Sequence, residues 1–293
     1  MRRLIINADD LGLTHGVNRA VEQAHAGGVV TSSTLMANSA AFDDAVALAR
    51  RHPELSVGCH VMLVDGEPLL PPNQVPSLVE GARFRNSFVS FARRALRRQL
   101  NPAEITAEAV AQIHKLQATG INVSHIDTHK HTHMFRAVLR PLLAAARKCG
   151  LRAIRNPFAP MKPLAFAHLL RRPRLWTRYS EVKVLASLHS GFAEEVRRAG
   201  LATTDGTFGV VSTGALDLKL FAAIVGCIPE GTWEFVCHPG YNDADLAGVR
   251  TRLRASRAKE LEVLTSADAR FLLEQRGIEL ISFRELITAV APA

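Results

Sequence analysis

The chain has 293 residues, 47% of them hydrophobic and 22% charged, which leaves room for two ordinary domains or for one α/β barrel of about 250 residues. Its four cysteines show no CxxC spacing, and no apolar run approaches the ~20 residues that cross a bilayer. These features argue against a disulfide scaffold, a four-thiolate zinc site and a membrane-spanning chain, and they predict a cytoplasmic protein. The net charge of +9 predicts an anionic partner, but only 6% of residues are aromatic and no nucleic-acid-binding motif occurs, so nucleic acid is not expected.

Apolar, β-branched runs alternate with helical patterns over most of the chain. The predicted strands are 4–6, 29–36, 55–61, 121–126, 151–154, 207–211, 232–237 and 278–282. The predicted helices are 15–27, 40–51, 102–119, 135–149, 215–226 and 250–275. Such alternation is typical of a mostly parallel sheet covered by helices. Two proline-rich segments, 66–86 and 156–180, interrupt it, and long insertions of this kind are usually functional loops or lids.

Ionisable residues follow four of the predicted strands, which favours a barrel over an open sheet. In a (β/α) barrel the carboxyl ends of all strands meet on one face, whereas a doubly wound sheet brings together mainly the loops at its switch point. Neither GxGxxG after the first strand nor GxxxxGK[ST] occurs. The sequence therefore predicts a single distorted TIM-like (β/α) barrel over residues 1–293, with helical and loop insertions near 66–100 and 156–180. The strand-end residues are Asp9, Asp10, His60, the histidines of 125–133 and His238.

Asp9 and Asp10 follow the first strand in the motif Asn-Ala-Asp-Asp-Leu-Gly. Adjacent carboxylates repel each other unless a cation or a shared proton lies between them. The alternative is a strand-end turn in which Asp10 caps the next helix, which is the commoner arrangement for an isolated pair. The motif alone leaves both interpretations open.

Four histidines fall within residues 125–133, in His-Ile-Asp-Thr-His-Lys-His-Thr-His. Alternate residues of an extended segment point to the same side, so His129, His131 and His133 are expected to face one site. Imidazole and carboxylate ligands suit Zn²⁺ with one position open to water, and Mg²⁺, Co²⁺ and Ni²⁺ are the alternatives. The spacing does not decide whether His125 or His129 is the ligand.

His60 and His238 each end a predicted strand. Taken singly, each is more often a satisfied core histidine than a ligand, although the His-Pro-Gly turn at 238–240 would leave its imidazole facing the site. Cys59 and Cys237 precede these histidines and are therefore expected to face the opposite way, into the core.

Together the four strand-end motifs resemble one family. Asn-Ala-Asp-Asp-x-Gly, Gly-x-His about fifty residues later, His-Ile-Asp-x-His-x-His-x-His and finally Cys-His-Pro are similar in order and spacing to the motifs of the YdjC-type carbohydrate deacetylases, which include the chitooligosaccharide deacetylases. The resemblance extends from the N-terminus to about residue 285 and implies a TIM-like barrel. Within the family the chain is most similar to the deacetylases of bacterial hopanoid biosynthesis, which act on an N-acetylglucosaminyl hopanoid.

The resemblance implies a role for each motif. Asp9 corresponds to the general base of the family, and Asp10, His60 and His129 correspond to its metal ligands. His238 is implied as the acid, or as a residue that positions it. The other residues expected to bind substrate or to orient the ligands are His125, Asp127, His131, Arg155 and Tyr241.

The chemistry of such a set is coherent. A divalent ion held by one aspartate and two histidines lowers the pKa of a bound water toward ~7 and polarises an acetamide carbonyl. Asp9 can accept the proton as the water attacks, and a charged His238 can supply one to the leaving nitrogen. Arg155 either binds Asp9 or a substrate oxygen, or lies on the surface before Pro157, and the sequence favours neither.

Residues 83–100 hold six arginines and no acidic residue, with Phe84, Phe88, Phe91 and Ala95 at helical spacing. A basic amphipathic helix of this kind suits an anionic membrane interface, and residues 164–178 carry a similar mixture of arginines and apolar side chains. The alternative is a pair of barrel helices with solvated outer faces. Because both segments lie in long insertions, peripheral contact with the inner face of the membrane is as well supported as that alternative.

The sequence therefore predicts metal-dependent hydrolysis of the N-acetyl group of an amino sugar, with an N-acetylglucosaminyl hopanoid glycolipid as the preferred substrate. Deacetylation of soluble chitooligosaccharides is the first alternative. A non-catalytic metal- or sugar-binding barrel is the alternative of a different class. Replacing Asp9 with Asn separates the two classes, because a binding module has no turnover to lose.

Overall fold

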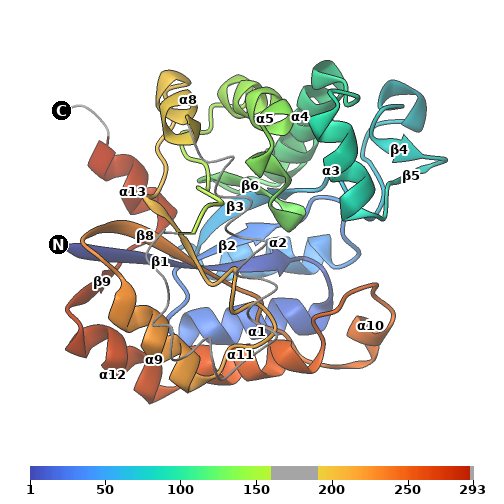
Figure 1. Cartoon of the computed structure of the whole chain (residues 1–293). Coiled ribbons are helices and arrows are strands. Elements are labelled where there is room, and N and C mark those ends of the chain that lie inside the picture. The colour runs from blue at the N-terminus through green and yellow to red at the C-terminus, as the bar shows by residue number, and fades with distance from the viewer. Residues whose placement is uncertain (160–190, 291–293) are drawn as a thin grey trace.

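A computed structural model describes residues 1–159 and 191–290 (Figure 1). Most of the insertion predicted at 156–180 lies outside the described residues. Its predicted role as a lid concerns that same part of the chain. The described strands are β1 (Arg2–Leu11), β2 (Ser32–Leu35), β3 (Ser56–Val61), β4 (Val79–Glu80), β5 (Arg83–Phe84), β6 (Ile126–Thr128), β7 (Gly206–Phe208), β8 (Gly231–Cys237) and β9 (Ile278–Leu280).

Helices connect most of these strands. The α-helices are α1 (His15–Ala26), α2 (Phe42–Arg51), α3 (Phe88–Leu96), α4 (Pro102–Ala118), α5 (Arg136–Lys148), α8 (Phe192–Arg198), α9 (Leu218–Cys227), α10 (Ala244–Ala247), α11 (Ala255–Thr265), α12 (Ala267–Gln275) and α13 (Phe283–Val290). Two 3₁₀ helices are η1 (Pro72–Gln74) and η2 (His129–Met134). Within the described ranges, no helix is both long enough and apolar enough to pass through a lipid bilayer.

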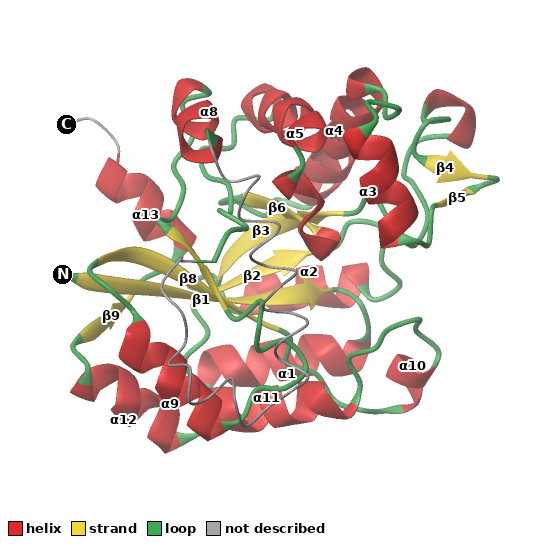
Figure 2. Cartoon of the chain, viewed as in Figure 1, coloured by secondary structure: helices red, strands yellow, loops and turns green. Residues whose placement is uncertain are grey.

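The main sheet is parallel and curled, and helices flank its outer face (Figure 2). Its strand order is β6-β3-β2-β1-β8-β7, with β9 paired to the first residues of β1. Backbone hydrogen bonds continue the curl from the β6 edge toward β7, because Ile154 N donates to Ala202 O over 3.0 Å and Thr207 N donates to Phe158 O over 2.9 Å. This arrangement confirms the predicted TIM-like barrel class.

Side chains of β1 alternate between the outer helices and the interior of the curl. Leu4 and Ile6 belong to the large apolar core that the helices cover, whereas Ile5 belongs to a separate small cluster. The partners of Ile5 in that cluster include Ala153, Ala202 and Phe283, which fill the interior near the start of β1. Asn7 and Asp9 follow Ile5 on the same face, so the interior changes from apolar to polar toward the carboxyl end of the strand.

Several sequence-predicted elements differ from the structure. The strand predicted at 121–126 begins only at Ile126, and the one at 151–154 makes only isolated bridges. The helix predicted at 250–275 divides at Ser266, whose side chain accepts a hydrogen bond from Ala269 N and thereby caps α12. Residues 66–86 contain η1 and the whole β4–β5 hairpin in addition to loop.

The arginine-rich helix α3 packs its apolar stripe inward. Phe91 and Ala95 are buried, and the ring of Phe88 lies 6.2 Å from that of Phe135, which precedes α5. Two other apolar side chains of α3 face solvent, since Val89 is 59% exposed and Leu96 is 65% exposed. The stripe predicted to lie on a membrane therefore covers the core instead, and only Val89 and Leu96 remain available for an external contact.

Candidate active site

Asp9 and Asp10 reach the same group of polar side chains, although neighbours on a regular strand point to opposite sides. The register between β1 and β2 shifts between Ala8 and Leu11, and Asp10 has a φ of 67°. Such a bulge redirects a side chain, and aspartate tolerates the left-handed region better than most residues. The side chain that caps α1 is Thr14, which accepts from Val17 N, so the interpretation of Asp10 as a helix cap is wrong.

Three potential metal-ligating atoms converge beside this bulge. Asp10 Oδ1 lies 3.6 Å from His60 Nε2 and 3.4 Å from His129 Nδ1, and the two ring nitrogens are 3.4 Å apart. Asp10 Oδ1 is buried and accepts no hydrogen bond from the described residues. A buried carboxylate oxygen that faces two imidazole nitrogens is a donor set that suits a divalent cation. The residues present therefore fit the metal ion that the sequence predicts.

Groups behind the triad hold the ligands in place. Asp127 Oδ1 lies 2.7 Å from His60 Nδ1, because His60 and Asp127 are register partners on β3 and β6. Burial alone would lower the pKa of His60, but the negative charge of Asp127 raises it to about 9 in the metal-free site. Burial would raise the pKa of Asp10, yet the Arg257 guanidinium and the contact with His129 hold it well below its usual value. Because ligand histidines bind as neutral imidazoles, metal binding at this triad would release a proton.

Arg155 neutralises a group of buried carboxylates. Its Nη2 donates to Asp9 Oδ1 over 2.6 Å and its Nη1 donates to Asp9 Oδ2 over 2.8 Å, which makes a bidentate pair. The same guanidinium lies 2.5 Å from Asp127 Oδ2 and donates through Nε to Glu234 Oε1 over 2.8 Å. Arg155 is fully buried, so the alternative that placed it on the surface is wrong.

The network sets the protonation states of its carboxylates. Burial would raise the pKa of Asp9, but the charge of Arg155 holds it well below its usual value, so Asp9 is ionised. Burial raises the pKa of Glu234 to about 7, against the opposing effect of Arg155. Asp9 is therefore a buried, charged carboxylate whose orientation Arg155 fixes.

His238 approaches the same Asp9 oxygen, Oδ2, that Arg155 Nη1 contacts. Its Nε2 is 4.0 Å from Asp9 Oδ2, its side chain is 12% exposed, and its Nδ1 has no hydrogen-bond partner among the described residues. Its backbone N donates to Glu260 Oε2 over 2.6 Å. On the same helix, α11, Arg257 Nη2 donates to Asp10 Oδ2 over 2.5 Å. Helix α11 therefore contacts both Asp10 and the backbone of His238.

The His-rich segment is not extended. It forms η2, and Lys130 and His131 have φ values of 54° and 52°, so the prediction that alternate histidines share one side is wrong. His129 faces Asp10, whereas His133 Nδ1 lies 2.7 Å from Thr128 Oγ1 and its ring faces Phe192. For His131, burial and then the charge of Arg155 lower the pKa to about 3, so this imidazole is neutral near the site.

Two other predicted site residues make their contacts elsewhere. His125 is fully buried, its ring stacks on Phe283 with 3.6 Å between centroids, and its Nδ1 lies 2.9 Å from Ser124 Oγ. It occupies the same strand face as Asp127 but one layer deeper in the interior. The Tyr241 hydroxyl donates to Gln23 Oε1 over 2.5 Å, which places it against α1. A contact of either residue with substrate remains a prediction.

The buried position of His125 predicts how stability depends on pH. Burial lowers its pKa well below the ordinary value, so the folded state holds it neutral while the unfolded chain protonates near pH 6.5. Above pH 6.5 His125 is neutral in both states and does not change the free energy of unfolding. Below pH 6.5 the unfolded chain binds a proton that the folded state does not, so the free energy of unfolding falls by up to about 1.4 kcal/mol per pH unit. In urea unfolding between pH 7.5 and pH 5, His125→Gln should show a shallower decline than the wild type. His114→Gln, at an exposed histidine, should match the wild type, and equal slopes for all three proteins would refute the expectation.

Several residues of the site were not found by sequence reasoning. Glu234 carries a signal, because it is an acidic residue inside the apolar strand segment Trp-Glu-Phe-Val-Cys. Arg257 and Glu260 carry none, since they lie on a polar helix far along the chain from Asp10. Their roles depend on the packing of α11 against α1, which no local pattern predicts.

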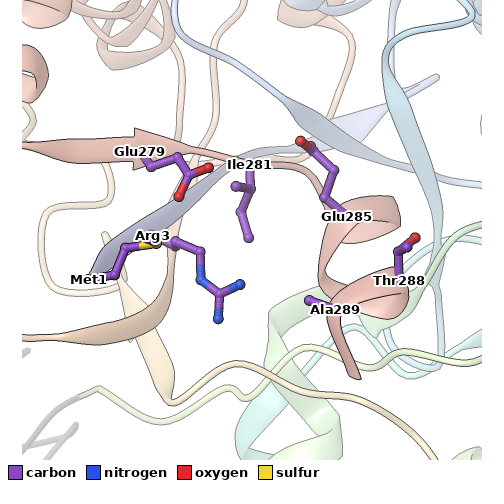
Figure 3. Close-up of a pocket in the computed structure, with 7 residues that line it drawn as sticks. All are labelled: Met1, Arg3, Glu279, Ile281, Glu285, Thr288 and Ala289. Atoms are coloured by element: carbon purple, nitrogen blue, oxygen red, sulfur yellow. The ribbon is translucent and has the colours of Figure 1, made fainter. Parts of the chain in front are cut away.

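A cavity of about 420 Å³ lies apart from this site, beside the first residues of β1 and β9 (Figure 3). Arg3, Glu279 and Glu285 contribute its charged side chains. Because β1 and β9 run parallel, this cavity is at the opposite end of the sheet from Asp9 and Asp10. None of the predicted catalytic or metal-binding residues lines it.

Comparisons with known proteins cover almost the whole chain. The sequence model of the family described as "YdjC-like protein" matches residues 3–275. A carbohydrate deacetylase of Brevibacillus brevis is 33% identical over 287 residues, which are 97% of this chain and 99% of that protein. A chitooligosaccharide deacetylase of Klebsiella pneumoniae subsp. pneumoniae is 32% identical over 286 residues, again 97% of this chain and 99% of the relative.

The fold is also similar to solved structures. A crystal structure from Enterococcus faecalis V583, of a candidate cellobiose-phosphate cleavage protein, superposes with a TM-score of 0.79 at 29% identity and covers 97% of this chain and 98% of its own. An uncharacterised protein of Agrobacterium tumefaciens C58 superposes with a TM-score of 0.51 at 14% identity, covering 97% of this chain and 89% of its own. The second likeness concerns the fold alone.

Proposed function

The chain belongs to the YdjC-like family, and from this membership and the geometry of the site we propose that it is a hydrolase that removes the N-acetyl group of an amino sugar. The observation that carries the proposal is the pairing of two adjacent carboxylates with different surroundings. Asp10 faces two histidine nitrogens, as a metal ligand does, whereas Asp9 is ionised and faces His238. A proton acceptor, a proton donor and a cation site are the groups that amide hydrolysis requires.

Asp10, His60 and His129 would hold the divalent cation, which we propose to be Zn²⁺ because two imidazoles and one carboxylate suit that ion. When bound, such an ion supplies Lewis acidity that lowers the pKa of a water and polarises a carbonyl oxygen. The remaining steps use the chain's own side chains. Asp9 Oδ2 accepts a proton from the attacking water while Arg155 keeps the carboxylate in position.

His238 would complete the reaction as the proton donor. As the water oxygen bonds to the acetyl carbon, the C–N bond of the acetamide must break, and the leaving nitrogen must gain a proton to become an amine. His238 Nε2, which lies 4.0 Å from Asp9 Oδ2, donates that proton when the ring is charged. The products are acetic acid, which ionises to acetate, and the free amino sugar. The proton that Asp9 accepts from water balances the proton that His238 gives to the nitrogen.

We propose an N-acetylglucosaminyl hopanoid glycolipid as the finer choice of substrate. Two features support it: the similarity of the motifs to those of the hopanoid-biosynthesis deacetylases, and the exposed Val89 and Leu96 beside the exposed Arg93 and Arg97 on α3. Apolar side chains among arginines would let α3 rest on an anionic membrane surface. Soluble chitooligosaccharides are the competing substrate, supported by the names of curated relatives.

Measuring acetate release tests both the proposed deacetylation and the proposed choice of substrate. Zinc-loaded protein is incubated with N-acetylglucosaminyl hopanoid in anionic vesicles and, separately, with diacetylchitobiose, and Asp9→Asn serves as the blank. We expect release from the glycolipid at a rate at least tenfold above that from the disaccharide. Release from the disaccharide alone would retain the reaction and reject the lipid substrate. Release from neither, by protein shown to contain metal, would reject the deacetylase itself.

A further inference from the structure

Three ligand-type side chains also meet at the opposite end of the sheet from Asp9 and Asp10. His25 is in the last turn of α1, His52 directly follows α2, and Glu54 precedes β3, whereas His60 lies near the far end of β3. One potential ligand atom from each of these three side chains lies within 4.8 Å of the other two. The cluster shares no residue with the site described above.

The hydrogen bonding of His25 defines which of its nitrogens is free. Its Nδ1 lies 2.8 Å from the carbonyl oxygen of Val30, and a carbonyl only accepts, so Nδ1 carries the N–H. In the neutral ring Nε2 then has a lone pair, and it faces Glu54 Oε1 at 3.2 Å. Two acceptors that face each other at this distance need a positive charge between them.

His52 repeats the arrangement with a carboxylate in place of the carbonyl. Its Nε2 lies 2.9 Å from Glu22 Oε1 and its Nδ1 lies 3.2 Å from Glu54 Oε1. A neutral imidazole has one N–H, so one of these two nitrogens also faces an acceptor with its lone pair. An outer nitrogen bound to a carbonyl or a carboxylate is the usual support of a metal-ligating histidine.

From this geometry we propose that His25 Nε2, His52 Nδ1 and Glu54 Oε1 bind one divalent transition-metal ion, with Zn²⁺ as the best match for two imidazoles and a carboxylate. Ligands about 2.0–2.1 Å from a tetrahedral ion lie about 3.3 Å from one another, close to both nitrogen–oxygen distances. The histidine side chains are 11% and 20% exposed, and that of Glu54 is 60% exposed, so an ion reaches the cluster from solvent. The site would tie the end of α1 to the α2–β3 connection.

Neighbouring charges leave room for such an ion. Arg51 binds Glu22, with Nη2 3.0 Å from Oε1. Arg284 donates to the carbonyl oxygens of Pro53 and Leu55 on either side of Glu54. Each arginine is therefore engaged with another acceptor, and neither makes an ion pair with Glu54 in the described part of the chain.

Zinc stoichiometry tests the proposal on metal-free full-length protein. Inductively coupled plasma analysis after equilibrium dialysis should find one equivalent fewer in His52→Gln than in the wild type, and no change in His114→Gln, an exposed histidine outside the cluster. The Asp10→Asn variant should retain one equivalent that is lost in the double variant Asp10→Asn/His52→Gln. Zinc should raise the Tm of Asp10→Asn but not that of the double variant.

Two further measurements make the result independent of folding and of the proposed activity. Glu54→Gln, at a mostly exposed side chain, should weaken zinc binding more than the ~10- to 100-fold typical of lost supporting contacts, while leaving acetate release unchanged. Equal zinc content in wild type, His52→Gln and Glu54→Gln would overturn the proposal and leave the cluster as a hydrogen-bonded group of side chains. A wild type with one equivalent and a His52→Gln variant with none would retain this site while rejecting the Asp10 triad.

Discussion

Asp9→Asn should lower kcat for acetate release by about 100- to 10,000-fold while the protein keeps its metal, because asparagine cannot accept the proton of the attacking water. The substitution leaves Asp10, His60 and His129 unchanged, so zinc content should equal that of the wild type. Arg155 retains Asp127 and Glu234 as partners, which should preserve the fold. Steady-state kinetics and metal analysis on the same preparations give both values.

Two other aspartates sharpen this experiment. Asp10→Asn should lose metal and activity together, because it removes a ligand. Asp43→Asn, at an exposed position on α2, should leave kcat unchanged. An Asp9→Asn protein that keeps more than a tenth of the wild-type kcat with full metal content would show that the proton acceptor is another group.

Arg155→Met should lower the free energy of unfolding by about 3–5 kcal/mol at pH 7.5, the cost typical of removing one partner from a buried charge network. Without the guanidinium, Asp9, Asp127 and Glu234 remain buried against one another. Burial then raises the pKa values of Asp9 and Glu234 in the folded state, and a group whose folded pKa is raised adds stability at low pH. The deficit relative to wild type should therefore shrink as pH falls from 7.5 to 5 in urea unfolding.

A surface arginine provides the matched comparison. Arg136 pairs with Glu195 and its side chain is 59% exposed, so Arg136→Met should cost no more than about 1 kcal/mol. Adding Glu234→Gln to Arg155→Met should recover part of the loss, since it removes one of the uncompensated carboxylates. If Arg155→Met were as mild as Arg136→Met, the network would have no stabilising role.

The strand-end residues could be predicted because parallel strands bring their carboxyl ends together. Asp9, Asp10, His60 and His238 lie on three different strands or just beyond them, and topology alone makes them neighbours once a barrel is assumed. Burial of Cys59 and Cys237 likewise follows from strand alternation, and both are buried. The alternation of side chains along these strands predicts their surroundings correctly, because one face of each strand packs against the helices and the other face lines the interior of the curl.

The same reasoning failed where the backbone leaves the strand. The His-rich segment turns into η2 at His129, and the left-handed residues Lys130 and His131 separate histidines that an extended segment would align. His125 illustrates a different limit. Strand alternation predicts which face of the sheet its side chain occupies, but it does not predict how deeply that side chain is buried in the interior. Long-range partners such as Arg257 depend on helix packing, which a single sequence does not encode locally.

The bulge at Asp10 has a consequence for anyone who would transplant this chemistry into another barrel. Copying the two aspartates onto a regular strand would send one carboxylate outward, into the layer where Leu4 and Ile6 meet the helices. The graft would need the irregular segment from Ala8 to Leu11 as a unit, with its shift in register. Likewise, deletion of Ala8 would move Asp9 to the strand position that Ala8 now occupies, on the face away from Arg155.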